Sequence, residues 1–247
     1  MANFVKQLIK IDQQLNIQAL HRQVEEIVKI LNYLNQKQVL PAAPDPIGFM
    51  PDEYEELSLL LDRHDTLLLK QADNLLNNFR SYLSRNYGLW SLANLTTAKM
   101  IRRQYHIKNS LEVMAGNSYW SAAFDRIGVQ AISTDSMSWA KTSETGRYSF
   151  YRTEQLSAPA AIKKYHDVDL VICCWAPNFG KGDLDVLKAF RKYNNQGHLL
   201  FIGEKDGATN TDEFWKNAKI IHNSKIKLVN QTFPNFDFID EKIYEIR

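Results

Sequence analysis

The segment from Glu112 to Asp135 contains residues whose types and spacing could bind a polar ligand. Glu112 lies in an apolar run, Gly116 follows that run, and Asp135 ends a second apolar run 19 residues after Gly116. If the two runs are strands of an open α/β sheet, Gly116 lies in a turn before a helix. The free N–H groups of such a helix favour polar or anionic groups, and a missing Cβ lets a ligand approach the backbone. An acid at the end of the second strand can accept hydrogen bonds from two ribose hydroxyls, so the spacing predicts a site for a ribose-containing ligand.

Alternating strand and helix patterns after about Tyr87 predict the sheet that would position this site. Helical patterns separate apolar runs that predict strands at residues 111–115, 129–134, 148–152, 168–175 and 198–203. The run 168–174 is apolar on both strand faces, which is typical of a central strand covered on both sides. The alternation predicts a parallel sheet with helices on both faces. Further expected elements are helices at 92–104 and 211–218 and two terminal strands, 226–230 and 242–246, joined by a loop.

Helical periodicity dominates the first third of the chain. Apolar residues recur at steps of three and four over 17–34 and again over 57–83, the latter as one long helix or two short ones. Between them, the prolines of 39–53 exclude a continuous helix, and Asp52 is expected to cap the helix that follows. We therefore predict a helical N-terminal extension over 1–86 and an α/β domain over 87–247.

Composition indicates a globular protein of a reducing compartment. The chain has 247 residues, 45% of them hydrophobic and 23% charged, and its net charge of +2 gives no argument for nucleic acid or an anionic membrane. Adjacent strand residues point to opposite faces, so Cys173 and Cys174 are not expected to form a disulfide. The N-terminus has no signal-peptide pattern and no run approaches a membrane span, so we expect a cytoplasmic protein. The scattered histidines show no metal-ligand spacing, so no metal is expected.

The opening segment resembles the first motif of the class I S-adenosylmethionine-dependent methyltransferases. That motif is a strand ending in an acid, followed by a Gly-x-Gly-x-Gly turn, and Glu112-Val113-Met114-Ala115-Gly116-Asn117-Ser118 occupies its place. Tyr119-Trp120-Ser121-Ala122 is similar to the start of the next helix in one bacterial branch of the family. Met114 and Ser118 replace two of the three glycines, which makes the motif degenerate. The Gly-x-Gly-x-x-Gly pattern of nicotinamide enzymes is not present.

The resemblance covers roughly Tyr87 to the C-terminus and implies a fold, a cofactor and a set of binding residues. The implied fold is Rossmann-like α/β, with a mainly parallel seven-stranded sheet, an antiparallel edge hairpin and the helical extension as a cap. S-adenosyl-L-methionine is the implied cofactor. Asp135 would bind its ribose, Gly116 its methionine part, Glu112 its amino group, and Thr153 and Glu154 its adenine edge. Trp175 would face the sulfonium. The resemblance further implies that Asn117, Tyr119 and Ser136 bind the cofactor and that Tyr87, Trp90, Pro177 and Asn178 contact the acceptor.

Structural interpretations of the same residues stay open. Glu112 could pair with a basic residue, Gly116 could be an ordinary turn glycine, Asp135 could cap a helix, and Trp175 could be a core residue.

Several functions also stay open. The first is a methyltransferase that acts on an unidentified, small-molecule acceptor. The second is a catalytically inactive methyltransferase-like scaffold that binds a protein partner or a nucleotide, and the replaced glycines favour it. The third is another nucleotide-binding enzyme, such as one that uses a nucleotide sugar. The leucine stripes of the first third also leave a homodimer open.

Overall fold

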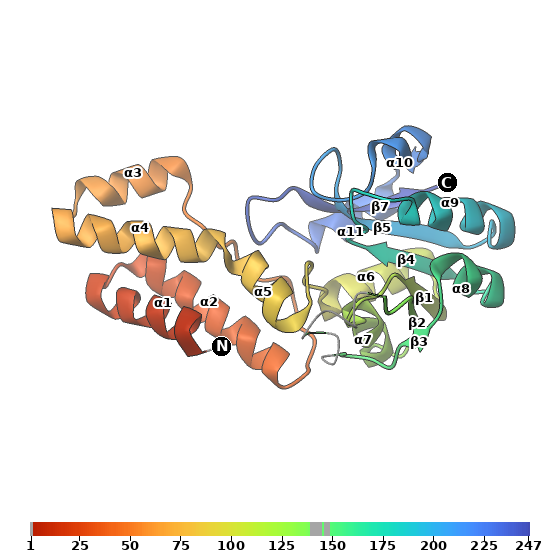
Figure 1. The fold of residues 1–247 in the computed structure, drawn as a ribbon, viewed down its shortest axis with the longest axis horizontal. Helices are drawn as coiled ribbons and strands as arrows, with labels where there is room; N and C mark the ends of the chain where they lie inside the picture. Colours follow the sequence, from red (N-terminus) through yellow and green to blue (C-terminus); the bar gives the residue numbers. More distant parts are fainter. Residues whose placement is uncertain (1, 139–144, 146–148) are drawn as a thin grey trace.

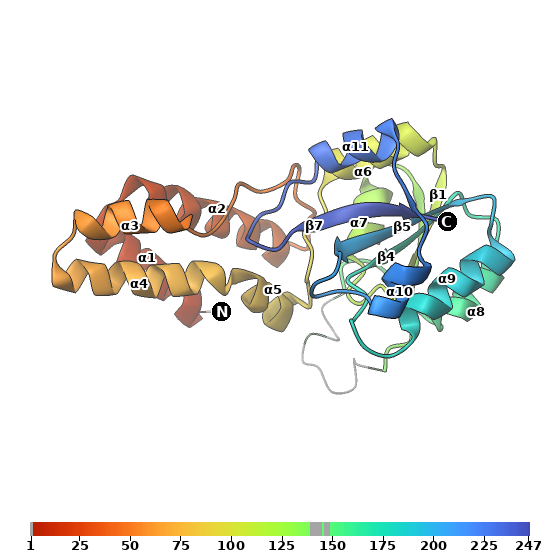
Figure 2. The same cartoon turned by 90° about the horizontal axis from the view of Figure 1, so that it is seen from above.

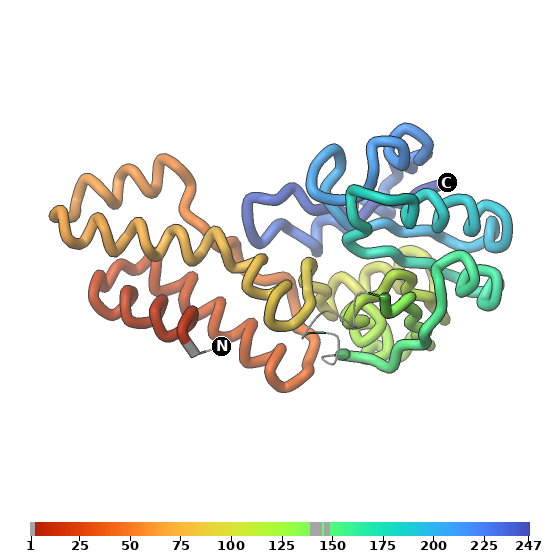
Figure 3. The backbone as a smooth tube through the Cα atoms, viewed as in Figure 1, coloured from red at the N-terminus to blue at the C-terminus, as the bar shows by residue number. Residues whose placement is uncertain are grey.

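The chain builds a bundle of N-terminal helices beside a mostly parallel sheet (Figures 1 and 2). The computed structural model describes residues 2–138, 145 and 149–247. Helices α1 to α4 form the bundle, and α5 leads from it to the sheet, as the backbone trace in Figure 3 shows. The elements in chain order are α1 (Ala2–Leu15), α2 (Gln18–Asn35), α3 (Pro51–Leu59), α4 (Arg63–Asn77), α5 (Phe79–Tyr87), α6 (Leu95–Tyr105), β1 (Asn109–Val113), α7 (Tyr119–Arg126), β2 (Gln130–Asp135), β3 (Glu154–Gln155), α8 (Ala158–Lys164), β4 (Leu170–Cys174), α9 (Gly182–Tyr193), β5 (His198–Glu204), α10 (Asp212–Asn217), β6 (Ile220–Ile221), α11 (Ser224–Gln231) and β7 (Glu241–Ile246).

The sheet has seven strands in the order β3-β2-β1-β4-β5-β7-β6. Strands β1 to β5 pair in parallel, whereas β7 is antiparallel to both β5 and β6. This confirms the expected α/β fold, with its mainly parallel sheet, antiparallel edge and N-terminal helices. The strand order reverses direction between β1 and β4. Val113 of β1 lies opposite Thr134 of β2 and Cys173 of β4, so the carboxyl ends of these three strands are level.

Alternate residues of the central strand pack into two hydrophobic cores, one on each face of the sheet. Leu170 and Ile172 of β4 belong to the core that includes residues of α6, α7 and α11. Val171 and Cys173 belong to the core that includes residues of α8, α9 and α10. Because successive strand residues point to opposite faces, this arrangement explains why the run is apolar at consecutive positions.

The N-terminal bundle shares the first of these cores. Leu8 of α1, Ile27 of α2 and Leu69 of α4 are buried in the same cluster as Phe124 of α7 and Ile202 of β5. Apolar burial therefore connects the bundle to one face of the sheet. Among the residues that the structure describes, no helix is both long and apolar enough to cross a bilayer.

The end of the chain differs from the sequence expectation. Residues 226–230, expected as a strand, lie in helix α11, and the edge strand before β7 is the short β6 at 220–221. The side chain of Asn223 caps α11 by accepting a hydrogen bond from the Ile226 N–H at 2.9 Å. Ile226 and Val229 are buried three residues apart, a helical spacing, and α11 packs on α6. A helix therefore joins the last two strands where a loop was expected.

Three other element boundaries differ from the sequence expectation. The third strand is β3 at 154–155, whereas residues 149–152 of the expected strand are not in a strand and Tyr148 lies outside the described residues. Helix α3 begins at Pro51 with Met50 at its N-cap, so Asp52 lies in the first turn and is not the cap. The helix expected at 92–104 begins at Leu95, because Asn94 caps it by accepting a hydrogen bond from the Thr97 N–H at 2.8 Å.

Candidate functional site

A cavity of about 970 Å³ lies at the carboxyl ends of β1, β2 and β4. The turn after β1, the end of β2 at Asp135 and the turn after β4 at Trp175 form part of its lining, together with the segment that follows α5 and the start of α9. This is the point where the strand order reverses, and ligands of open α/β sheets bind at such points. The expected site residues that line it are Glu112, Gly116, Asn117, Tyr119, Asp135, Ser136, Trp175, Trp90 and Pro177.

The turn after β1 has the backbone of a glycine-rich turn, although two of its glycines are replaced. Met114, Gly116 and Ser118 have φ angles of 52°, 53° and 62°, in the left-handed region that favours glycine. The Ser118 N–H donates to the Ala115 carbonyl at 2.7 Å and closes the turn. A Cβ built on Gly116 would have no atom within 4 Å, so this glycine faces open space.

The two replacing side chains leave the cavity open. Met114 lines its wall and lies against the start of α9, because a Cβ added to Gly182 would come within 3.0 Å of the Met114 Cε. The Ser118 hydroxyl is buried and hydrogen-bonds to Ser133 at 2.6 Å and to Thr153 at 2.5 Å. Ser118 is not part of the cavity lining, so its side chain stabilises the turn from behind.

Asp135 joins the end of β2 to the turn after β1. Its Oδ2 accepts a hydrogen bond from the Gly116 N–H at 2.9 Å, and its Oδ1 accepts one from the Met137 N–H at 2.7 Å. The carboxylate is therefore held at the cavity wall beside Gly116. The sequence spacing of 19 residues corresponds to direct contact between the two residues.

Glu112 is a buried acid at the back of the same cavity. Its side chain is 2% exposed, and its Oε2 accepts a hydrogen bond from the Ser121 N–H at 2.7 Å. Burial raises the pKa of Glu112 to about 7, the donors of Ser121 oppose this rise, and the charge of Asp135 adds to it. A cation that entered the cavity beside Glu112 would favour its ionised form.

Four of the expected residues lie outside the cavity lining. Thr153 hydrogen-bonds to Ser118 behind the turn. Glu154 is exposed at its carboxylate and bonds to Lys164 and Tyr165, each at 2.6 Å, and the Lys164 ammonium lowers the pKa of this carboxyl.

The other two, Tyr87 and Asn178, differ in exposure. Tyr87 is buried, its hydroxyl donates to Asn35 at 2.8 Å, and its carbonyl accepts a hydrogen bond from Asn117, so it supports the cavity wall. Asn178 is exposed beyond the turn after β4.

Trp175 is positioned by a buried polar network. Its φ angle is 52°, and its indole N–H donates to Glu241 Oε1 at 2.7 Å. Arg80 donates to Glu241 Oε2 at 3.0 Å and to both oxygens of Asp237 at 2.7 and 2.8 Å. The Trp90 ring stacks on Trp175 with centroids 5.3 Å apart and an interplanar angle of 13°.

Sequence reasoning missed this network. Arg80 and Glu241 are 161 residues apart, on α5 and at the start of β7, and neither lies in a motif. It also missed Arg85 and Asp185, which line the cavity. One feature of the sequence could have indicated Arg85 as a cavity residue: it lies in a helical stretch just before the expected site residues Tyr87 and Trp90.

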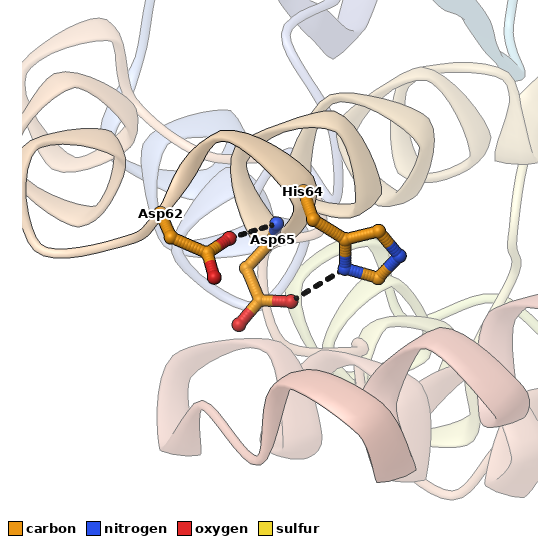
Figure 4. A group of neighbouring side chains, drawn as sticks. All are labelled: Asp62, His64 and Asp65. Carbon is orange, nitrogen blue, oxygen red and sulfur yellow. Dashed lines mark hydrogen bonds and ion pairs between the residues drawn. The ribbon is translucent and has the colours of Figure 1, made fainter.

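Three side chains of metal-ligating type lie together in the bundle, on α4 and its N-cap. Within the described ranges, Asp62, His64 and Asp65 are near enough to share an ion (Figure 4). Asp62 caps α4 by accepting a hydrogen bond from the Asp65 N–H at 2.8 Å, and His64 Nδ1 lies 3.0 Å from the Asp65 carboxylate. Asp62 and His64 are exposed, and helix capping accounts for the arrangement.

Comparisons with known proteins give similarity at the level of three-dimensional structure. No family model matches the chain, and no curated protein matches its sequence. A TehB-like SAM-dependent methyltransferase from Corynebacterium glutamicum is similar at 11% identity and a TM-score of 0.44, over 69% of this chain and 96% of that one. The 1,6-didemethyltoxoflavin-N1-methyltransferase of Burkholderia thailandensis, solved with S-adenosylhomocysteine, is similar at 13% identity and a TM-score of 0.43, over 68% and 86% of the chains.

A candidate O-methyltransferase from Nostoc punctiforme is similar at 11% identity and a TM-score of 0.39. The similarity covers 71% of this chain and 61% of that one, so the chain spans less than two thirds of its length. These similarities are too distant to say what this chain binds. The fold rests on the strand order described above.

Proposed function

We propose that this protein binds S-adenosyl-L-methionine in the cavity and transfers its methyl group to a small-molecule acceptor. The observation that carries the proposal is the contact between Asp135 and Gly116 at an open cavity, on a turn that keeps three left-handed residues. The left-handed backbone at Met114 and Ser118 would cost about 1–2 kcal/mol at each residue.

The residues of the cavity fit the chemical groups of this cofactor. Asp135 would accept hydrogen bonds from the ribose hydroxyls. Glu112 would face the amino group of the cofactor, and the positive charge of that group would favour the ionised form of the Glu112 carboxyl. Gly116 offers a side-chain-free surface where nothing lies within 4 Å of an added Cβ. The Trp175 ring is stacked on Trp90 and has the Arg80 guanidinium 4.8 Å from its centroid, so the proposal does not include it as a contact of the sulfonium. Thr153 and Glu154 lie outside the lining, so the proposal does not include them as adenine contacts.

Methyl transfer asks for positioning more than for acid–base groups. When bound, S-adenosylmethionine would supply a methyl group whose carbon–sulfur bond breaks as the bond to the acceptor forms, which leaves S-adenosylhomocysteine and any proton that the acceptor carried. The chain's part is to hold two ligands in line and to exclude water. The buried acids and the aromatic wall of the cavity suit this task.

Calorimetric titration with S-adenosylhomocysteine tests the proposal. We expect micromolar binding to the wild type and a loss of about ten-fold or more in Asp135→Asn, because hydrogen bonds to a charged acceptor contribute about 1.5–3 kcal/mol each. Asparagine keeps one of the two oxygens that accept backbone N–H bonds in the turn, so circular dichroism of the variant must first show that it folds as the wild type does. Glu154→Gln is the matched control, since this acid lies outside the cavity lining and its affinity should not change.

Two results would contradict the proposal. Equal affinity of Asp135→Asn and the wild type would remove Asp135 from the site. Absence of any binding to the folded wild type would favour a scaffold that has lost its cofactor.

A further inference from the structure

Trp90 presents a rigid and exposed aromatic face to the cavity. Its side chain lines the cavity and is 48% exposed, although it stacks on Trp175. An exposed tryptophan normally keeps rotamer freedom, which a ligand must remove when it binds. A tryptophan that is already fixed offers its area without this cost.

A column of flat groups fixes this ring. Trp90 lies 5.3 Å from Trp175, the Arg80 guanidinium lies 4.8 Å from the Trp175 ring, and the same guanidinium lies 4.2 Å from the Phe236 ring. Arg80 also donates a hydrogen bond to the Trp90 carbonyl. Glu241 accepts from both Trp175 and Arg80, so the column is cross-linked by buried hydrogen bonds. Trp90 is its exposed end, and one more flat ring would extend it.

Arg85 gives the same cavity a cationic group. It lies in the last turn of α5 and is exposed, and it lines both this cavity and a second hollow between α1, α4 and α5. Among the residues that the structure describes, it has no hydrogen bond or ion pair, and it is the one basic side chain in the lining. Glu112, Asp135 and Asp185 are the acidic side chains of the described lining, so Arg85 is the charged side chain there that suits a carboxylate; binding of 2-naphthoate in the presence of S-adenosylhomocysteine would show that the carboxylate of the cofactor does not occupy it. Its planar guanidinium suits a carboxylate.

We propose that the acceptor is a flat aromatic carboxylate, whose ring stacks on Trp90 and whose carboxylate binds Arg85. This rests on the proposed function in one respect, namely that the second ligand of the cavity is a methyl acceptor. Parallel stacking on Trp90 gives a flat ring a higher affinity than a puckered ring of the same size. The Arg85 guanidinium gives a ring that carries a carboxylate a higher affinity than the same ring without one.

Binding of 2-naphthoate to the full chain, measured by calorimetry with and without S-adenosylhomocysteine, tests the proposal. We expect Trp90→Leu and Arg85→Gln each to weaken 2-naphthoate binding about ten-fold. Phe238→Leu is the matched control for the ring, because Phe238 is an exposed aromatic residue (56%) outside the cavity lining. Arg103→Gln, an exposed arginine of α6 outside the lining, is the control for the charge. Neither control should change the affinity.

Two further probes separate shape from charge. The saturated decahydro-2-naphthoate keeps the acid and the apolar surface but is not flat, and 2-naphthol keeps the flat ring without the carboxylate. Both should bind about ten-fold more weakly than 2-naphthoate. Equal binding of 2-naphthoate to wild type and Trp90→Leu, equal binding of the saturated acid, or no binding of 2-naphthoate would overturn the proposal.

The titrations also separate this proposal from the cofactor proposal. Binding of 2-naphthoate that depends on Trp90, with no binding of S-adenosylhomocysteine, would keep the aromatic site and reject methyl transfer. Binding of S-adenosylhomocysteine, with no binding of 2-naphthoate, would keep the cofactor proposal and reject the aromatic acceptor site.

Discussion

Replacing Met114 separately by glycine and by alanine tests whether the turn after β1 has the backbone of a glycine-rich turn. Both substitutions remove the contact of the methionine side chain with α9, so this loss cancels when the two variants are compared. What remains is the backbone. At a φ of 52°, alanine keeps the left-handed strain and glycine does not.

The expected difference follows from two opposing terms. Left-handed backbone costs a non-glycine residue about 1–2 kcal/mol. Glycine makes the unfolded chain more flexible and thereby costs about 0.4–1 kcal/mol relative to alanine. Met114→Gly should therefore be more stable than Met114→Ala by about 1 kcal/mol.

Ala115 provides the control within the same turn. Its φ is not positive, so Ala115→Gly brings no relief and should lower stability by about 0.4–1 kcal/mol. Urea unfolding measures both comparisons, as shifts of the midpoint at a common dependence on urea. The refuting result is that Met114→Gly is less stable than Met114→Ala. Glycine would then lower stability at position 114 just as it is expected to at position 115, so the backbone at position 114 would not be left-handed, and the argument for a ligand-binding turn would fail.

Two further predictions concern buried charges, both measured by urea unfolding. Because folding raises the pKa of Glu112 from an ordinary 4.5 to about 7, the folded state keeps a proton that the unfolded state releases. Wild-type stability should therefore fall by about 3 kcal/mol between pH 4.5 and 7, and Glu112→Gln should lack this fall; parallel pH profiles would contradict it. Arg80→Ala should destabilise by about 3–5 kcal/mol, because it leaves the buried Glu241 unpaired; a loss below about 1 kcal/mol would show that the network contributes little.

The strong periodicities of the sequence predict most of the fold. The run ending at Cys174 is apolar on both faces, and β4 is the central strand with a core on each side. The failures are short segments. Residues 226–230 look like a strand because a run of this length fits either structure. The cap at Asn223 and the packing of α11 on α6 decide for a helix.

The candidate site was partly predictable for the same reason. Gly116 and Asp135 follow adjacent parallel strands, and residues at the ends of such strands must lie close together. Glu154 was expected to follow a strand at 148–152, but it lies in β3 and bonds to Lys164 and Tyr165 at the surface.

The sequence by itself determined the alternation of strands and helices, the apolar central strand and the spacing that brings Asp135 to Gly116, because these depend on local periodicity and chain order. Only the tertiary structure decided that Met114 and Ser118 keep left-handed backbone, since their residue types argue against it; the Ser118 hydroxyl is held by Ser133 and Thr153, and the Met114 side chain packs against α9. It alone joined Arg80, Glu241 and Trp175 into one network. Contacts between residues far apart in the chain arise from packing, which no local pattern encodes.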